Sequence, residues 1–301
     1  MKNPNQQQLN KLLEYFNNKQ YDDAEKLGLS LTKQFPKHQF SWKILGVIFQ
    51  LNGKITKSLA AMQKSVELEP KDSGAHNNLA STLKKLGRLE DAEASYRKAI
   101  ALKLDYFEAY CSLANTLKEL RRLVEAEASF RQAIAIKPDF FEAHFNLGNT
   151  LVELGTLEKS EASFRQAIEL RPNFPEAHNN LGSTLKSLGR LDEAMASFRQ
   201  AIAIKPDFFE AHHNLGKTLK GLGRLDEAEA SFAQTIVLKP NFAEAHHNLG
   251  NTLKGLGRLD EAEASFAQTI VLNPKNFKAR EELLRCLYEQ DKKSVFFDEL
   301  D

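Results

Sequence analysis

The sequence predicts an all-α fold, a solenoid built from tandem pairs of short helices. Three observations predict it. The stretch EAHHNLGKTLKGLGRLDEAEASF (Glu210–Phe232) returns 34 residues later with one change, Lys217 to Asn251. Proline and glycine fall at fixed places of this period. Within each period the apolar residues recur with the spacing of two amphipathic helices. A fixed period of this length is typical of stacked repeats, because one such unit cannot bury its apolar faces alone.

The 34-residue register runs through the chain without insertion or deletion. Its blocks begin at Asn5, Gln39, Ser73, Phe107, Phe141, Pro175, Phe209 and Ala243, and a partial block begins at Phe277. A residue's place is counted below from the start of its block. We expect an atypical or capping repeat over residues 1–38, seven tandem repeats over 39–276, and a capping helix and tail over 277–301. That tail is also consistent with a linker to a further domain.

One block shows why each period should hold two helices. The apolar face of the first helix comprises Ala177, Leu181, Thr184, Leu185 and Leu188, spaced as on one side of a helix. That of the second helix comprises Ala194, Phe198, Ala201 and Ile202. A turn must join them, so each block reads as helix–turn–helix.

The ends of these helices are also predicted from the sequence. Asn173 and Glu176 have the spacing of a capping box at the start of the first helix. Gly189 stands where a left-handed residue should end that helix, and Pro206 should stop the second one. Arg121 replaces the glycine in an earlier block, and we expect its turn to be rebuilt, since a left-handed arginine costs about 1 kcal/mol.

The recurring residues Leu181-Gly182, Ala194, Phe198, Ala201 and Pro206 match the signature of the tetratricopeptide repeat. The chain resembles this family over nearly its whole length. The resemblance implies a right-handed superhelix of helix pairs, in which the non-core face of each first helix lines a concave groove that binds proteins or peptides.

The composition of the chain indicates which classes of partner and which compartment to expect. The chain of 301 residues is 42% hydrophobic and 27% charged, with a net charge of +1, so it has no basic excess for nucleic acid or an anionic membrane. It contains no run of 18 apolar residues and no apolar secretion signal. Cys111 and Cys286 lack CxxC spacing, which suits a reduced cytosol. We expect a cytoplasmic protein without nucleic-acid or membrane partners; the sequence leaves self-association open.

Neither catalysis nor a cofactor is expected. The phosphate-binding, dinucleotide-binding, HExxH and GxSxG motifs are all absent. Five histidines share place 4: His76, His144, His178, His212 and His246. Stacked repeats put such rungs on the order of 10 Å apart, too far for two of them to share a zinc ion with bonds of about 2 Å. We therefore predict packing histidines, no metal and no enzyme.

The candidate binding site is the non-core face of the first helices, where asparagine predominates at places 6 and 9 and lysine at place 12. Its predicted residues are Asn78, Asn115, Asn146, Asn149, Asn180, Asn214, Lys217, Asn248, Asn251, Lys186, Lys220 and Lys254. An amide both donates and accepts hydrogen bonds, so such a column can hold the backbone of an extended peptide. It resembles the asparagine ladder in the superhelix of O-linked N-acetylglucosamine transferase. The alternative is a solvated face copied with the repeat.

A second apolar stripe sets the block at Gln39 apart. It comprises Phe40, Ile44, Val47 and Leu51, at places where later blocks carry polar residues. A helix that is apolar on both sides is usually buried on both sides. We expect the first block to cover this stripe; otherwise it is an exposed docking patch.

The leading interpretation is a scaffold that binds proteins or extended peptides in its groove. A second is a substrate-recruiting arm of a larger enzyme, of glycosyltransferase, sulfotransferase or iron/2-oxoglutarate oxygenase type, since similar repeats often precede such domains; the abrupt FFDELD end favours it. A third is a passive oligomerisation spacer. The carboxylate clamp that other members of the family use for chaperone tails is not expected, because no three consecutive blocks carry its residues.

Overall fold

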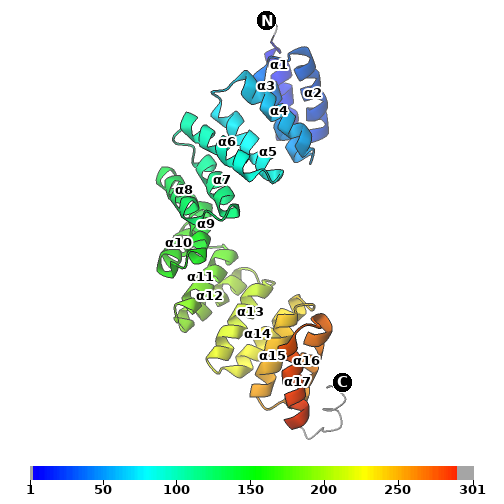
Figure 1. Ribbon diagram of the computed structural model, residues 1–301, viewed down its shortest axis with the longest axis vertical. Helices are drawn as coiled ribbons and strands as arrows, with labels where there is room; N and C mark the ends of the chain where they lie inside the picture. The colour runs from blue at the N-terminus through cyan, green and yellow to red at the C-terminus, as the bar shows by residue number, and fades with distance from the viewer. Residues whose placement is uncertain (1–2, 290–301) are drawn as a thin grey trace. The chain divides into compact units, whose positions relative to one another are not determined.

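The computed structural model of the protein describes residues 3–289, in which all regular structure is helical. Seventeen helices, α1 to α17, follow one another along this range (Figure 1). None of them is long and apolar enough to cross a membrane. The apolar residues of the expected C-terminal tail, Val295, Phe296, Phe297 and Leu300, lie outside the described range. The predicted all-α solenoid of helix pairs is confirmed.

The chain divides into two compact units between Leu154 and Gly155. The N-terminal unit holds α1 (Gln6–Asn17), α2 (Tyr21–Gln34), α3 (Gln39–Leu51), α4 (Ile55–Leu68), α5 (Ser73–Lys85), α6 (Leu89–Leu102), α7 (Phe107–Glu119), α8 (Leu123–Ile136) and α9 (Phe141–Glu153). The C-terminal unit holds α10 (Leu157–Leu170), α11 (Pro175–Ser187), α12 (Leu191–Ile204), α13 (Phe209–Gly221), α14 (Leu225–Leu238), α15 (Ala243–Gly255), α16 (Leu259–Leu272) and α17 (Phe277–Glu289).

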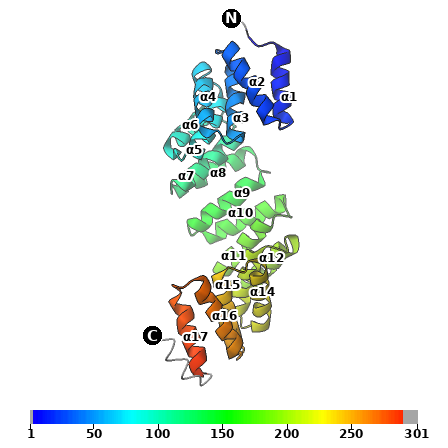
Figure 2. The same cartoon turned by 90° about the vertical axis from the view of Figure 1, so that its right-hand side faces the viewer.

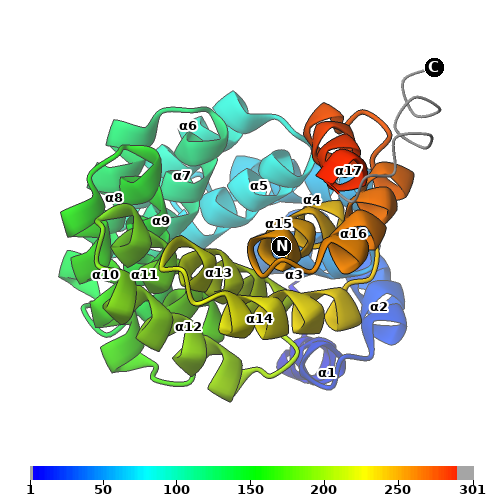
Figure 3. The ribbon, with the colours of Figure 1, turned by 90° about the horizontal axis from the view of Figure 1, so that it is seen from below.

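Within each unit the helices alternate between an inner and an outer row. Inside each of the two units, every helix packs against the next along the chain, as the turned view shows (Figure 2). Several odd-numbered helices of one unit also contact each other, for example α5 with α7, α11 with α13 and α13 with α15. Within the described range, no two even-numbered helices of one unit make a comparable contact. Viewed from below, α13 and α15 lie inside α14 and α16, and α5 and α7 inside α6 and α8 (Figure 3). We call the odd-numbered helices inner helices and the even-numbered ones outer helices.

One contact recurs in the core of each helix pair from α11 to α16. The phenylalanine at place 24 is fully buried, as in Phe198, Phe232 and Phe266. Its ring lies against the glycine at place 8 of the partner helix: a Cβ on Gly182 would stand 2.7 Å from Cε1 of Phe198. Real carbon atoms do not approach so closely, so a glycine here lets the two helices come together over the ring. The signature Leu-Gly pair and the phenylalanine are therefore two halves of one contact.

The turns inside the pairs bear out one prediction and overturn another. Gly189 is left-handed, with φ of +78°, as predicted. Arg121, expected to force a rebuilt turn, adopts φ of +62° instead. Its turn keeps the same bonds: Arg122 N donates to the carbonyl of Leu117, as Arg190 N does to that of Leu185. These bonds and the helix packing outweigh the strain of one left-handed residue.

The predicted capping box at Asn173 is wrong. The helix begins one residue later, with Phe174 as N-cap and Pro175 as its first residue, and no side chain caps it. Proline suits this position because its missing N–H would have no helical partner there. The start is held instead by His178, whose Nε2 donates to the carbonyl of Pro172 at 2.9 Å. The other place-4 histidines make the same bond to the carbonyl six residues earlier: His76, His144, His212 and His246.

We predict that Phe198→Ala lowers the urea midpoint of unfolding strongly, because it leaves a cavity between α11 and α12 that costs about 3–5 kcal/mol. Val237→Ala is the control, since this side chain is 71% exposed and can lose little. Circular dichroism during a urea titration measures both. Equal midpoints for the two variants would contradict the role given to the place-24 ring.

Candidate functional site

The inner face of the C-terminal unit gathers three of the predicted asparagines on successive inner helices. Asn180 lies on α11, Asn214 on α13 and Asn248 on α15, each one period after the last. A buried threonine follows each of them by four residues and donates its hydroxyl to the asparagine's own carbonyl. These threonines are Thr184, Thr218 and Thr252. The hydroxyls hold the backbone of the asparagines in place and leave the amide side chains for other contacts.

The amides of α11 and α13 form a hydrogen-bonded chain. Asn214 Nδ2 donates to Asn179 Oδ1 at 3.0 Å, and Asn179 Nδ2 donates to Asn180 Oδ1 at 3.2 Å. Asn179 was not among the predicted site residues, although its place 5 belongs to the same non-core face. Asn248 differs in its partner, because its Oδ1 accepts from Lys220 Nζ at 3.1 Å; its exposed fraction of 8% equals that of Asn179. The amides that hydrogen-bond to one another are therefore those on α11 and α13.

Two of the predicted lysines are neutralised within the unit. Lys217 Nζ lies 3.1 Å from Glu244 Oε1, and Lys254 Nζ lies 2.8 Å from Glu282 Oε2. The hydrogen bond that Lys254 donates to Glu282 raises the pKa of Lys254 above its ordinary value. Asn251 is likewise engaged, since its Nδ2 donates to Nε2 of His247 at 3.0 Å on its own helix.

The remaining two lysines have no carboxylate within ion-pair distance among the described residues. Lys186 and Lys220 lie half-buried on α11 and α13. Burial lowers the pKa of both, and the nearby charge of Lys217 lowers it further. Lys220 is also among the charges that lower the pKa of Lys186. The three ammonium groups therefore lie close enough to repel one another.

A buried histidine adjoins these lysines. His213, on α13, is 5% exposed, and its ring centroid lies 4.9 Å from that of Phe242. Its Nε2 is 3.3 Å from Glu244 Oε1, but neither ring nitrogen forms a well-directed hydrogen bond among the described residues. Burial lowers the pKa of His213, which Glu244 only partly offsets and Lys217 and Lys186 reinforce. The lowered pKa favours the neutral form of the ring more than in an exposed histidine.

The other predicted asparagines lie in the N-terminal unit. Asn78 is on α5, Asn115 on α7, and Asn146 and Asn149 are on α9. All four are half-buried, as the sequence pattern leads one to expect of a face that is neither core nor fully solvated. The lysines at place 12 of this unit, Lys84 and Lys118, each pair with a glutamate of the next inner helix.

The apolar stripe on α3 is covered at one end and open at the other. Ile44 packs against a cluster that includes Leu12 of α1 and Leu31 of α2. Phe40 and Val47 are half-buried, and Leu51 is 48% exposed at the end of the helix. The stripe thus divides between contact with the first two helices and solvent.

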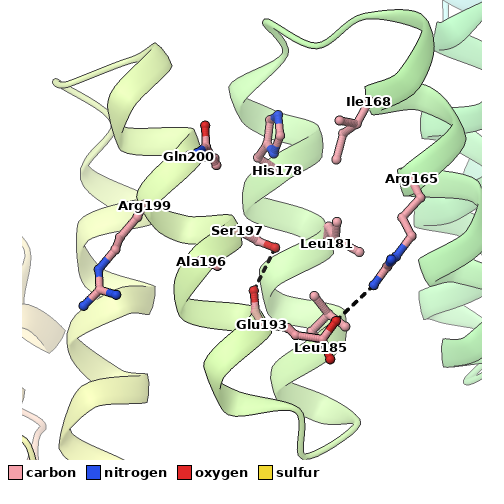
Figure 4. A pocket seen from close by; sticks show the side chains of 10 residues that line it. All are labelled: Arg165, Ile168, His178, Leu181, Leu185, Glu193, Ala196, Ser197, Arg199 and Gln200. Carbon is pink, nitrogen blue, oxygen red and sulfur yellow. Dashed lines mark hydrogen bonds and ion pairs between the residues drawn. The ribbon is translucent and has the colours of Figure 1, made fainter.

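An outer hollow offers a rival site. It has a volume of about 560 Å³ and lies between α10 and α12, with Leu181 and Leu185 of α11 among its lining residues (Figure 4). Arg165 and Glu193 pair across it at 3.2 Å. A hollow of about 320 Å³ recurs at equivalent places around Leu113 in the N-terminal unit. Recurrence in both units identifies it as a product of repeat stacking.

Both cysteines of the chain, Cys111 and Cys286, are buried. Within residues 3–289, no group of three or more His, Cys, Asp or Glu residues is arranged to hold a metal ion. Burial raises the pKa of the Cys111 thiol to about 12 and raises that of Cys286. Since the thiolate is the reactive form, both behave as buried apolar residues.

Stacked helix pairs with a polar inner face define an α-solenoid, so the protein belongs to the class of helical repeat proteins. Sequence models described as TPR repeat match residues 81–120, 122–155, 148–189 and 182–223. Models described as tetratricopeptide repeat match residues 61–94, 209–242 and 243–276. Together they cover more than two thirds of the chain, which therefore belongs to the tetratricopeptide repeat family.

Solved structures share this fold at low sequence identity. YrrB, described as a TPR protein with an unusual peptide-binding site, is 24% identical, with a TM-score of 0.54 over 61% of this chain and 95% of its own. A tetratricopeptide repeat protein from Parabacteroides merdae is 16% identical, with a TM-score of 0.60 over 83% of this chain and 98% of its own. The APC/C hetero-tetramer Cut9-Hcn1 is 15% identical, with a TM-score of 0.59 over 89% of this chain and 52% of its own. A comparison with curated protein sequences found no match.

We predict that acidification destabilises the protein partly through His213. Its folded-state pKa lies below the unfolded value of about 6.5, so the unfolded chain binds more protons and stability falls as the pH drops below that value. His213→Gln should therefore flatten the dependence of the melting temperature on pH between about 7 and 5. Thermal melts across this range measure it, and parallel curves for variant and wild type would contradict the burial argument.

Proposed function

We propose that the protein is a scaffold that binds extended peptide segments of partner proteins along the inner face of its C-terminal unit, without chemistry of its own. The observation that carries this proposal is the amide chain from Asn214 through Asn179 to Asn180. It joins neighbouring inner helices by groups that resemble a peptide backbone in their hydrogen-bonding capacity. A backbone laid beside the chain would meet donors and acceptors in alternation.

Preorganisation favours this role over that of a solvated polar face. Each amide has two N–H groups and an oxygen with two lone pairs, so the single bond that Asn214 Nδ2 makes to Asn179 leaves hydrogen-bonding capacity on that amide. The mutual bonds already restrict the side-chain rotamers, which reduces the entropy lost when a ligand binds. Because the contacts are to backbone, the amide row itself would be tolerant of partner sequence.

The similar structures support the class of function. YrrB is described by its peptide-binding site, and Cut9-Hcn1 is a complex between proteins. The likeness of the asparagine rows to those of O-linked N-acetylglucosamine transferase supports the same mode of binding. A recruiting arm of a larger enzyme would use this same inner face, and would differ only in what it delivers the partner to.

We predict that Asn179→Ala, Asn180→Ala and Asn214→Ala together weaken peptide binding by roughly ten- to a thousandfold. Each lost hydrogen bond removes about 0.5–1.5 kcal/mol, and every 1.4 kcal/mol is about tenfold in affinity. The ligands are peptides selected with the wild-type protein from a displayed random library, and the measurement is calorimetric titration.

Gln200→Ala, in the outer hollow, is the matched control and should bind as the wild type does. Circular dichroism should show the same helical content in all variants. If the triple variant binds the selected peptides with unchanged affinity, or if Gln200→Ala weakens binding as much, the inner amide row is not the binding site.

A further inference from the structure

The lysines at place 12 of the N-terminal unit are neutralised by their own neighbours. Lys84 Nζ lies 3.0 Å from Glu119 Oε1, and Lys118 Nζ lies 3.0 Å from Glu153 Oε1. Both glutamates stand at place 13 of the following block. In this unit, therefore, each of these two inner-face lysines is paired with a carboxylate from the next repeat.

This pairing is interrupted in the C-terminal unit. The residues that follow Lys186 and Lys220 at place 13 of the next block are Gly221 and Gly255, which end α13 and α15. Neither lysine forms an ion pair among residues 3–289, and Lys220 finds only the neutral amide of Asn248. Two half-buried cations are thus left without the carboxylates that their counterparts have.

A third lysine, paired with a glutamate, lies near these two. Place 9, asparagine or serine in the preceding repeats from Ser73 on, is Lys217 here. Its one carboxylate, Glu244, is shared with Nε2 of His213. Lys217 is thus paired, and the two lysines beside the amide row that form no ion pair among residues 3–289 are Lys186 and Lys220. Burial and the repulsion of nearby lysines lower the pKa of Lys186 and Lys220, as expected of half-buried cations that form no ion pair among residues 3–289.

We propose that Lys186, Lys217 and Lys220 dock an acidic peptide segment, whose carboxylates take the place that Glu119 and Glu153 fill in the N-terminal unit. The inference rests on the proposed function and names the chemistry of its partner. Lys186 and Lys220 are one repeat apart, on the order of 10 Å. An extended segment at about 3.1 Å per residue returns a side chain to the same side every third residue, so acidic residues about three apart fit best.

A peptide fits this face better than a nucleic acid does. Glu176, Glu210 and Glu244 recur at place 2 of the same inner helices. A continuous polyanion along the row would meet these carboxylates in every repeat, whereas a peptide can place its few charges opposite the lysines only. The neighbouring amides would hold the uncharged backbone between them.

The test uses two fluorescein-labelled twelve-residue peptides, one with glutamate at every third position among alanines and the other with glutamine there. Fluorescence anisotropy with the full chain should show tighter binding of the glutamate peptide, and added salt should weaken it. Lys186→Gln with Lys220→Gln should reduce its affinity by about tenfold or more, since charge-assisted hydrogen bonds are lost. The matched control, Lys84→Gln with Lys118→Gln, removes lysines that are already paired and should change the affinity by less than about twofold.

A second variant keeps all the lysines. Gly221 ends α13 in open space, with nothing within 4 Å of a Cβ placed there, so Gly221→Glu supplies the missing carboxylate without a clash. It should weaken binding of the glutamate peptide while leaving the melting temperature equal or higher, because glycine is a poor helix residue.

Three results would overturn the acidic-partner proposal: equal affinity for the two peptides, equal losses in the two lysine pairs, or no binding of the glutamate peptide. If the glutamine peptide binds as tightly and the asparagine variants weaken both, the peptide-binding function stands and only the acidic preference is wrong. If the asparagine variants weaken neither peptide, the proposed function itself fails.

Discussion

The structure depends on one constraint: two helices of 13 and 14 residues cannot bury their own apolar faces. Each pair must therefore pack against the next, and the contact of a glycine with a phenylalanine ring brings the two helices of a pair together closely. In the pairs of the C-terminal unit, a Cβ at place 8 would clash with this ring, as at Gly182, so the helices would have to shift. Stability in such an array comes from near neighbours along the chain, repeat by repeat.

This constraint also determines where function can reside. The outer helices and the core faces of the inner helices are committed to stacking, so the remaining polar places of the inner helices are free to vary. Near-identical repeats give the same side chain at the same place, which produces rows such as Asn180 and Asn214. The residues that depart from the consensus then distinguish one repeat from another. Lys217 replaces a neutral residue, and Gly221 and Gly255 stand where the N-terminal unit has glutamates.

The sequence predicts the parts that depend on local chemistry. Helix pairing and the left-handed glycine follow from periodicity and backbone preference, and both are observed. The start of the first helix was misplaced by one residue, because Pro175 and the bond from His178 decide it rather than Asn173. Arg121 is a second example, because packing imposes a left-handed backbone conformation that an arginine does not favour.

The ion pairs and pKa shifts of the inner face could not be predicted from the sequence, because they depend on which residues of neighbouring repeats contact each other. The rows of lysines follow from the 34-residue period, but their ion-pair partners do not. Lys254 pairs with Glu282, whereas the place-13 pattern would suggest Glu289, seven residues later. The burial of His213 between aromatic rings and its contact with Glu244 required the structure for the same reason.

The central claim, that partners bind along the inner helices of the C-terminal unit, is tested most directly by site-specific photocrosslinking. A photoreactive phenylalanine analogue would replace either Ser183, at an inner place of α11, or Gln200, at an outer place of α12, and a library-selected peptide would be the target. The account predicts that the peptide crosslinks to the probe at residue 183 and not to the probe at residue 200. Crosslinking at residue 200 alone would contradict it.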